Sequence, residues 1–191
     1  MTSPGADEQD AVAVQAAFEE LGRLSFAEHS LESVVRAVTE LTARVLPGHP
    51  AASVTVLRQQ SPTTIASSSA LAADLDRLQY RHHSGPCLTA ATSGQPAEIP
   101  DTGSDDQWPE FAAQAAAAGY GSVLSFPLPA QEMVSGSLNL YAREPARAGR
   151  RTRDLLPRFA AYAAVAVSNM YLYEAAVERA DHLQVGWTRA V

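Results

Sequence analysis

The chain has 191 residues, of which 46% are hydrophobic and 18% are charged, so it is long enough for one hydrophobic core and short for two. Its formal net charge of −7 disfavours a broad phosphate-binding face, and thus direct binding to nucleic acid. The first residues lack a signal peptide, and glycines and prolines break the longest uncharged stretch, 111–131, so we expect a cytoplasmic protein without a membrane helix. The single cysteine, Cys87, excludes an internal disulfide and a CxxC metal site.

The first part of the chain is predicted to be helical. Residues 1–10 are polar and are expected to form a flexible tail. Apolar residues then recur every three or four positions, which predicts a helix over 11–27. Ser30 is the expected N-cap of a second helix with a clear apolar face, which Pro47 and Gly48 end.

The apolar spacing changes from a helical period to alternation in the next segment. Residues 54–57 and 63–67 alternate apolar and polar side chains, which is typical of two strands in a hairpin. Ser69 then caps a helix with a leucine face that ends near Tyr80.

Glycine and proline divide the following residues into short elements. We expect a short helix over 87–93 that Gly94 ends, and an edge strand over 97–99 between two prolines. Another helix carries Pro109 in its first turn and Gly119 as its left-handed cap.

Two further strands, 122–128 and 135–141, precede a long C-terminal helix. No convincing helix breaker occurs from Thr152 onward, because Pro157 falls in the first turns and Gly186 lies near the end. At about 1.5 Å per residue such a helix is longer than a domain of this size is wide. Part of it must therefore project.

Three stretches of sequence carry a family resemblance: LQYRHHSGPCLTAATSGQPAEIPD, QWPEFAAQAAAAGYGSVLSFPL and GSLNLYA. They resemble the GAF domains that precede ANTAR domains in actinobacterial regulators of transcription antitermination. The resemblance implies an α+β fold with a central antiparallel sheet flanked by helices. It also implies that the long N- and C-terminal helices form a bundle in a dimer. We therefore divide the chain into a tail (1–10), a GAF-like sensor domain (11–178) and a helical linker (179–191).

The same resemblance implies a sensor that controls a separate output. The segment HLQVGWTRAV resembles the start of an ANTAR module, whose remaining helices do not follow in this chain. We thus expect a non-enzymatic domain that senses a small molecule or another signal and forms a homodimer. RNA would bind only through the ANTAR module, and the ligand or cofactor is unknown.

A candidate pocket lies on the loop-covered face of the predicted sheet, where GAF domains hold ligands. Aromatic side chains would supply most of its apolar surface, and a few strand residues would supply polar groups. The candidate residues are Tyr80, His82, His83, Cys87, Trp108, Phe111, Ser125, Phe126 and Asn139.

Cys87 supports an alternative function as the thiol of a redox sensor or a thiol-dependent enzyme. Its predicted place at a helix N-terminus would lower the pKa of the thiol and raise its reactivity. The opposite interpretation is that Cys87 is a small buried residue that closes the loop onto the sheet.

A metal site is not expected. His82 and His83 are adjacent, so in an extended segment they point to opposite faces. Pairing His83 with Cys87 would require a continuous helix through Gly85 and Pro86.

The predicted terminal helices carry an apolar stripe that could form a dimer seam. A second alternative function follows from this stripe, namely a dimerisation scaffold that binds no ligand. The candidate seam residues are Phe18, Leu21, Tyr162, Ala166, Met170, Tyr173 and Val177.

Overall fold

The computed structural model describes residues 4–24, 30–129 and 135–188, with side chains for 9, 11–24, 30, 32–129, 135–173, 175–177 and 179. The helices are α1 (Pro4–Arg23), α2 (Leu31–Val45), α3 (Ala70–His82), α4 (Pro86–Ser93), α5 (Pro109–Ala117) and α6 (Arg150–Thr188). The strands are β1 (Ala51–Arg58), β2 (Ser61–Ser67), β3 (Ala97–Ile99), β4 (Ser122–Pro127) and β5 (Ser135–Ala142).

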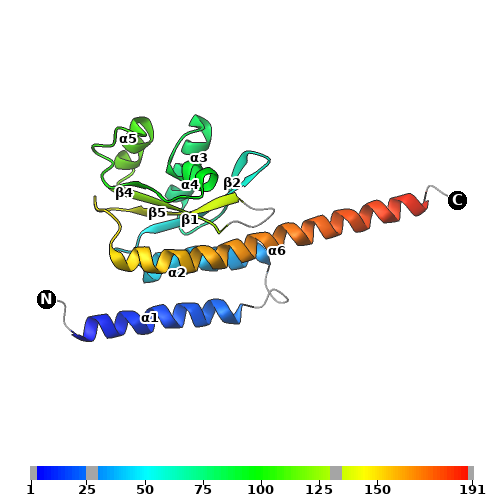
Figure 1. Cartoon of the computed structure of the whole chain (residues 1–191), viewed down its shortest axis with the longest axis horizontal. Coiled ribbons are helices and arrows are strands. Elements are labelled where there is room, and N and C mark those ends of the chain that lie inside the picture. Colours follow the sequence, from blue (N-terminus) through cyan, green and yellow to red (C-terminus); the bar gives the residue numbers. More distant parts are fainter. Residues whose placement is uncertain (1–3, 25–29, 130–134, 189–191) are drawn as a thin grey trace.

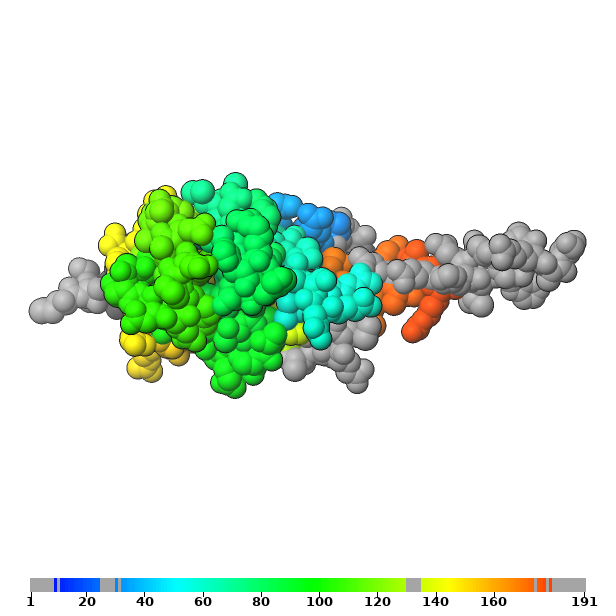
Figure 2. Space-filling model, turned by 90° about the horizontal axis from the view of Figure 1, so that it is seen from above, coloured from blue at the N-terminus to red at the C-terminus, as the bar shows by residue number. Residues whose placement is uncertain are grey.

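The five strands form one antiparallel sheet in the order β2-β1-β5-β4-β3. Figure 1 shows the layers: α3, α4 and α5 lie on one face, α2 and α6 lie on the other, and α1 lies outside α2 and α6. Seen from above, α3, α4 and α5 cover the first of these faces (Figure 2). Helices thus lie on both faces of the sheet.

The core on the α2 and α6 side is apolar. Even-numbered residues in the middle of β1 and β5, such as Val54 and Leu138, point to this side and are fully buried. Phe159 of α6 is also fully buried, and its ring stacks on Phe18 of α1 with 4.7 Å between the centroids. Apolar burial against α6 therefore holds both the sheet and α1.

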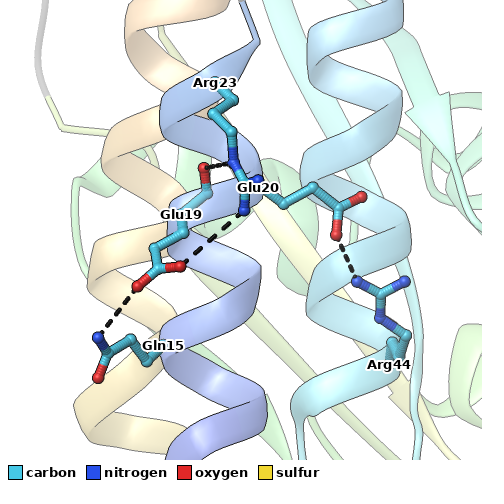
Figure 3. Close-up of polar contacts among 5 residues, drawn as sticks. All are labelled: Gln15, Glu19, Glu20, Arg23 and Arg44. Carbon is cyan, nitrogen blue, oxygen red and sulfur yellow. Dashed lines mark hydrogen bonds and ion pairs between the residues drawn. The ribbon is translucent and has the colours of Figure 1, made fainter.

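Ion pairs contribute less than this packing to the position of α1. Figure 3 shows Glu20 of α1 paired with Arg44 of α2 at 2.7 Å, and Glu19 with Arg23 within α1 at 3.9 Å. All four side chains are more than half exposed, and exposed pairs of this kind stabilise a protein by at most about 1 kcal/mol.

α6 is much longer than the sheet that it supports. Its 39 residues correspond to about 58 Å, and Figure 1 shows it extending well past the sheet. The expected projecting helix is therefore present. Across the residues that the structure describes, none of the helices combines the length and apolarity needed to cross a lipid bilayer.

Several local predictions are confirmed. Ser30 and Ser69 are N-caps whose side chains accept hydrogen bonds from the backbone N–H groups of Ser33 and Ala72. Gly94 and Gly119 have φ values of +67° and +84°, in the left-handed region. The strand at 97–99 lies at the edge of the sheet.

The first helix differs from the expectation. It begins at Pro4, so residues 4–10, expected to form a flexible tail, are helical. It ends at Arg23, and residues 25–27 of the predicted helix lie outside the described residues. Polar residues such as Asp7, Glu8 and Gln9 give no apolar period but still fit a helix, which explains the error.

Three of the candidate seam residues pack within the chain's own core. Phe18 packs on Phe159, while Leu21 and Ala166 are buried in the core, so these residues are not free to contact a partner in this arrangement. By contrast, Tyr162, Tyr173 and Val177 are exposed and Met170 is half-buried. Helical spacing alone could not tell which side of α6 faces its own domain.

Candidate functional site

The face of the sheet beneath α3 and α4 is polar where a protein core is usually apolar. Ser53 and Thr55 of β1 and Ser137 and Asn139 of β5 all point to this side and are fully buried. Buried polar side chains stabilise a fold poorly unless each finds a partner. Such a cluster therefore suggests a functional role.

Asp76 of α3 lies at the centre of these residues and is completely buried. Its Oδ1 accepts hydrogen bonds from the hydroxyls of Tyr141 at 2.5 Å and Ser53 at 2.9 Å, and from Asn139 Nδ2 at 3.4 Å. Its Oδ2 accepts one from Thr64 at 2.9 Å. Four neutral donors thus surround this carboxyl group.

A β-bulge brings Thr64 into position. The pairing of β1 with β2 steps from Val54–Ala66 to Thr55–Thr64, which leaves Ile65 as the extra residue. Without the bulge, Ile65 would stand opposite Thr55, and a methyl-bearing side chain would replace a hydroxyl beside Asp76.

Burial changes the acidity of Asp76. Loss of solvent raises the pKa of this carboxyl from 3.8 to about 6, although the hydrogen bonds from Tyr141, Ser53, Thr64 and Asn139 oppose the rise. No arginine or histidine among the described residues pairs with it. Asp76 is therefore a buried carboxylate near neutral pH with neutral partners only.

Tyr80 bridges two strands on the same side. Its hydroxyl lies 2.9 Å from Thr55 Oγ1 and 2.8 Å from Thr64 Oγ1, and either atom of each pair can donate. Burial, and then the charge of Asp76, raise the pKa of Tyr80, so it stays protonated. We define the Asp76 cluster as Ser53, Thr55, Thr64, Asp76, Gln79, Tyr80, Asn139 and Tyr141.

Gln79 ties the turn between α3 and α4 to this cluster. Its Nε2 donates to the Tyr141 hydroxyl at 3.1 Å, and its Oε1 accepts from the Cys87 backbone N–H at 2.9 Å. Gly85 has a φ of +149°, and a Cβ there would lie 2.3 Å from Gln79 Oε1. Only glycine allows the turn to close over Gln79 in this way.

With this geometry established, the comparisons with known proteins place the chain in a family. The model of the GAF domain matches residues 28–168, which is more than half of the chain. The chain belongs to the GAF family. Among curated proteins, none matches its sequence.

Solved structures show the same GAF fold. The GAF domain of a phosphoenolpyruvate-protein phosphotransferase from Coxiella burnetii is 15% identical with a TM-score of 0.65, over 87% of this chain and 96% of that one. The chromophore-binding domain of an unusual bacteriophytochrome from R. palustris is 12% identical with a TM-score of 0.63, over 91% and 64%. A type II free methionine-R-sulfoxide reductase from Thermoplasma acidophilum is 15% identical with a TM-score of 0.53, over 73% and 96%.

Some of the predicted pocket residues of this GAF domain meet and others do not. Tyr80 and Asn139 belong to the Asp76 cluster, and Cys87 adjoins it through Gln79. Ser125 is buried on the same face, opposite Asn139. Phe126 points to the α2 and α6 side, because successive strand residues face opposite ways, so it cannot line the same site as Ser125.

The other candidates lie at the edge of the site or in the apolar core. His82 is 3.3 Å from Glu110 through Nδ1 and Oε2, and His83 is the exposed left-handed C-cap of α3. Trp108 and Phe111 are buried with other apolar residues beneath α5. Within the described part of the chain, no group of three potential metal ligands occurs.

Sequence reasoning missed the centre of the site. Asp76 and Gln79 were not proposed, although both fall on the buried face of α3 with Ala72 and Leu75. The spacing of these four positions is helical, and two polar residues within such a stripe are the signal that could have found them.

Cys87 is inaccessible in this GAF domain. The residue is fully buried, and burial, followed by the charge of Asp76, raises the pKa of its thiol well above the ordinary value. The predicted lowering at a helix N-terminus is therefore wrong, because loss of solvent outweighs the helix dipole.

We expect the thiol of the native chain to resist reagents such as dithionitrobenzoate. Labelling of Cys87 should be complete in urea and should proceed in native buffer only as fast as the chain opens. The release of the coloured thiolate measures both rates. Rapid stoichiometric labelling in native buffer would contradict the buried position of Cys87 and would support the thiol-dependent function.

Proposed function

We propose that this GAF domain is a ligand-sensing regulatory domain whose signal binds at the Asp76 cluster and leaves through α6. GAF domains generally sense signals. The observation that carries the proposal is the buried polar face beneath α3 and α4, whose carboxylate, Asp76, has only neutral hydrogen-bond donors as partners. A buried group that lowers the free energy of unfolding is typical of binding sites.

The strand β5 connects the site to α6, because its side chains point to the two different sides of the sheet. On β5, Asn139 belongs to the Asp76 cluster, while the neighbouring Leu138 and Leu140 pack in the core that contains Leu156 and Phe159 of α6. A ligand that moves β5 must also move the surface on which α6 rests. It can bias α6 only by binding two arrangements with different affinities.

The proposed active form is a homodimer that pairs through α6. The described part of α6 exposes five large apolar side chains at helical spacing, a pattern that suits a seam between two equal helices. They are Tyr162 (38%), Val165 (47%), Leu172 (60%), Tyr173 (68%) and Val177 (41%). The proposed seam therefore leaves out the buried candidates Phe18, Leu21 and Ala166 and consists of exposed residues of α6.

A charged residue in the seam is expected to break the dimer. Val165→Arg should yield a monomer, because two guanidinium groups would face each other across the seam, whereas the unchanged chain should be a dimer. Light scattering after size exclusion gives the mass directly. Leu71→Arg, at a 49% exposed apolar position on α3, is the matched control and should remain dimeric. Equal masses for the two variants would argue against a seam on α6.

We further propose that the domain belongs to a cytoplasmic transcription antitermination regulator with an ANTAR module. The support is the resemblance of the loop and strand segments around Cys87, Trp108 and Ser125, together with a helix that continues to Thr188. The test is the gene sequence after Val191. A helical RNA-binding module in the same frame would support the proposal, and a different output domain would overturn it.

One observation favours a dimerisation scaffold as a second candidate. The polar atoms of the Asp76 cluster satisfy one another, so side chains of the chain itself fill the space beneath α3 and α4. Native mass spectrometry of the purified chain, compared with an Asp76→Asn variant, separates the two functions. A small molecule that is retained only by the unchanged chain supports the sensor.

A further inference from the structure

Asp76 lacks the positive charge that a buried carboxylate normally has as a partner. Its four hydrogen bonds come from three hydroxyls and one amide, all of them neutral. Hydrogen bonds from neutral donors only partly offset the free energy lost when a carboxylate leaves water. A ligand cation would supply the missing partner.

The Gln79 carboxamide marks the place that such a ligand would take. Its oxygen accepts the N–H of Cys87 in the first turn of α4, where the helix dipole favours negative charge. Its nitrogen donates to the Tyr141 hydroxyl, which in turn donates to Asp76. Gln79 thus places an acceptor at the positive end of the site and a donor at the negative end.

Ser125 provides an independent sign of a missing ligand. Its hydroxyl is buried and has no hydrogen-bond partner among the residues that the structure describes. Ser125 pairs with Asn139 across β4 and β5, so its side chain lies directly beside the Asp76 cluster. Buried hydroxyls are nearly always hydrogen-bonded, and each exception requires an explanation.

The surface beside the turn between α3 and α4 is hollowed on both sides. Two hollows flank it and share Ser84: one of about 210 Å³ next to Trp108, and one of about 480 Å³ between Leu88 and Pro62. Gly85 gives this turn backbone freedom that other residues lack. Binding at the Asp76 cluster would require Gln79 to swing outward, so that the turn opens above Tyr141.

We propose that the Asp76 cluster binds a free α-amino acid, whose ammonium group replaces the Gln79 amide nitrogen and whose carboxylate replaces the amide oxygen. The inference rests on the sensor function proposed above and names its ligand class. An α-amino acid has a donor and an acceptor at a separation similar to that in a carboxamide, with a positive charge toward Asp76 and a negative charge toward α4. Tyr141, Ser125 and the Cys87 N–H complete the contacts.

Calorimetric titration with each standard L-amino acid, near neutral pH, tests this inference. At least one should bind, with one molecule per chain. The matched amine without the carboxylate and the matched acid without the amine should each bind about tenfold more weakly or worse. The inference is overturned if no amino acid binds either the unchanged chain or Gln79→Ala, or if the matched compounds bind equally well.

Variants separate binding from folding. Gln79→Ala should bind the amino acid several-fold more tightly, because it removes the internal competitor, and a merely structural role for Gln79 would not produce that gain. Asp76→Asn should bind about tenfold more weakly or worse. Ser125→Ala should bind more weakly without a fall in melting temperature, because its hydroxyl has no partner to lose. Arg77→Gln, on the exposed side of α3, should match the unchanged chain.

Two kinds of failure remain distinct. If another small molecule is retained by the unchanged chain and lost in Asp76→Asn, the amino-acid class is wrong but the sensor function stands. If the chain is a dimer and retains no small molecule, both proposals fail and the scaffold is favoured.

Discussion

An Asp76→Asn variant is expected to be more stable than the unchanged chain above about pH 6, and to lose this advantage as the pH falls toward 3.8. The pKa of Asp76 is raised by burial to about 6 in the folded chain, against 3.8 when exposed. Asp76 therefore stabilises the fold fully below pH 3.8, and this contribution disappears as the pH rises through about 6. Asparagine does not ionise, so the variant escapes that loss.

The size of the effect follows from the two pKa values. Each pKa unit corresponds to about 1.4 kcal/mol, so the change from 3.8 to about 6 gives an advantage of about 3 kcal/mol at pH 8. Burial also raises the pKa values of Tyr80, Tyr141 and Cys87, so these neighbours stay protonated across the range.

The hydrogen bonds of the cluster can accommodate the asparagine. Tyr141, Ser53 and Asn139 can still donate to its oxygen. Thr64 must accept from the new NH₂ group, and it can then donate to Tyr80, because either oxygen of that pair can be the donor. The second N–H of the new group has no such acceptor among the residues that the structure describes, so the measured advantage should be smaller than the titration alone gives.

Urea unfolding at pH 4, 6 and 8 measures the difference in the free energy of unfolding. Arg77→Gln is the control for a charge change on the same helix and should show no such pH dependence. A difference between Asp76→Asn and the unchanged chain that stays constant with pH would show that Asp76 does not titrate in this range.

A more stable variant that no longer binds the proposed amino acid would explain why the carboxylate is present. Every residue of the Asp76 cluster could be apolar in a domain selected for stability alone. The combination of higher stability with weaker binding is what distinguishes a binding site from a structural network.

Much of the fold could be predicted because its signals are local. Ser30 and Ser69 are N-caps whose bonding groups lie within three residues, and Gly94 and Gly119 end helices because they adopt left-handed conformations. The edge position of 97–99 follows from its flanking prolines. Each of these features depends on neighbours in the sequence.

The centre of the site could not be predicted because it depends on distant contacts. Asp76 meets Tyr141 and Asn139 from a strand more than sixty residues away. Thr64 joins them only because a bulge at Ile65 shifts the register, and the sequence carries no clear mark of that bulge. The error at Phe126 was avoidable, since adjacent strand residues cannot share a face.

An aromatic stack joins α1 to α6, and Phe159→Ala is expected to be among the most destabilising substitutions in the chain. Phe159 is fully buried, and its loss should lower the free energy of unfolding by about 3–5 kcal/mol. It also removes the ring on which Phe18 stacks at 4.7 Å, so α1 should separate from α6 more readily.

Hydrogen exchange along α1, together with urea unfolding, tests both parts of this prediction. Tyr162→Ala is the matched control, because the ring of Tyr162 also lies next to that of Phe18, with 5.9 Å between the centroids. Tyr162 is 38% exposed, so its substitution should lower the free energy of unfolding by only about 1 kcal/mol. Equal losses for the two variants would show that α1 is held by its outer contacts. A larger loss for Phe159→Ala, with faster exchange in α1, would show that the buried base of α6 fixes α1. Any movement of α6 would then also move α1.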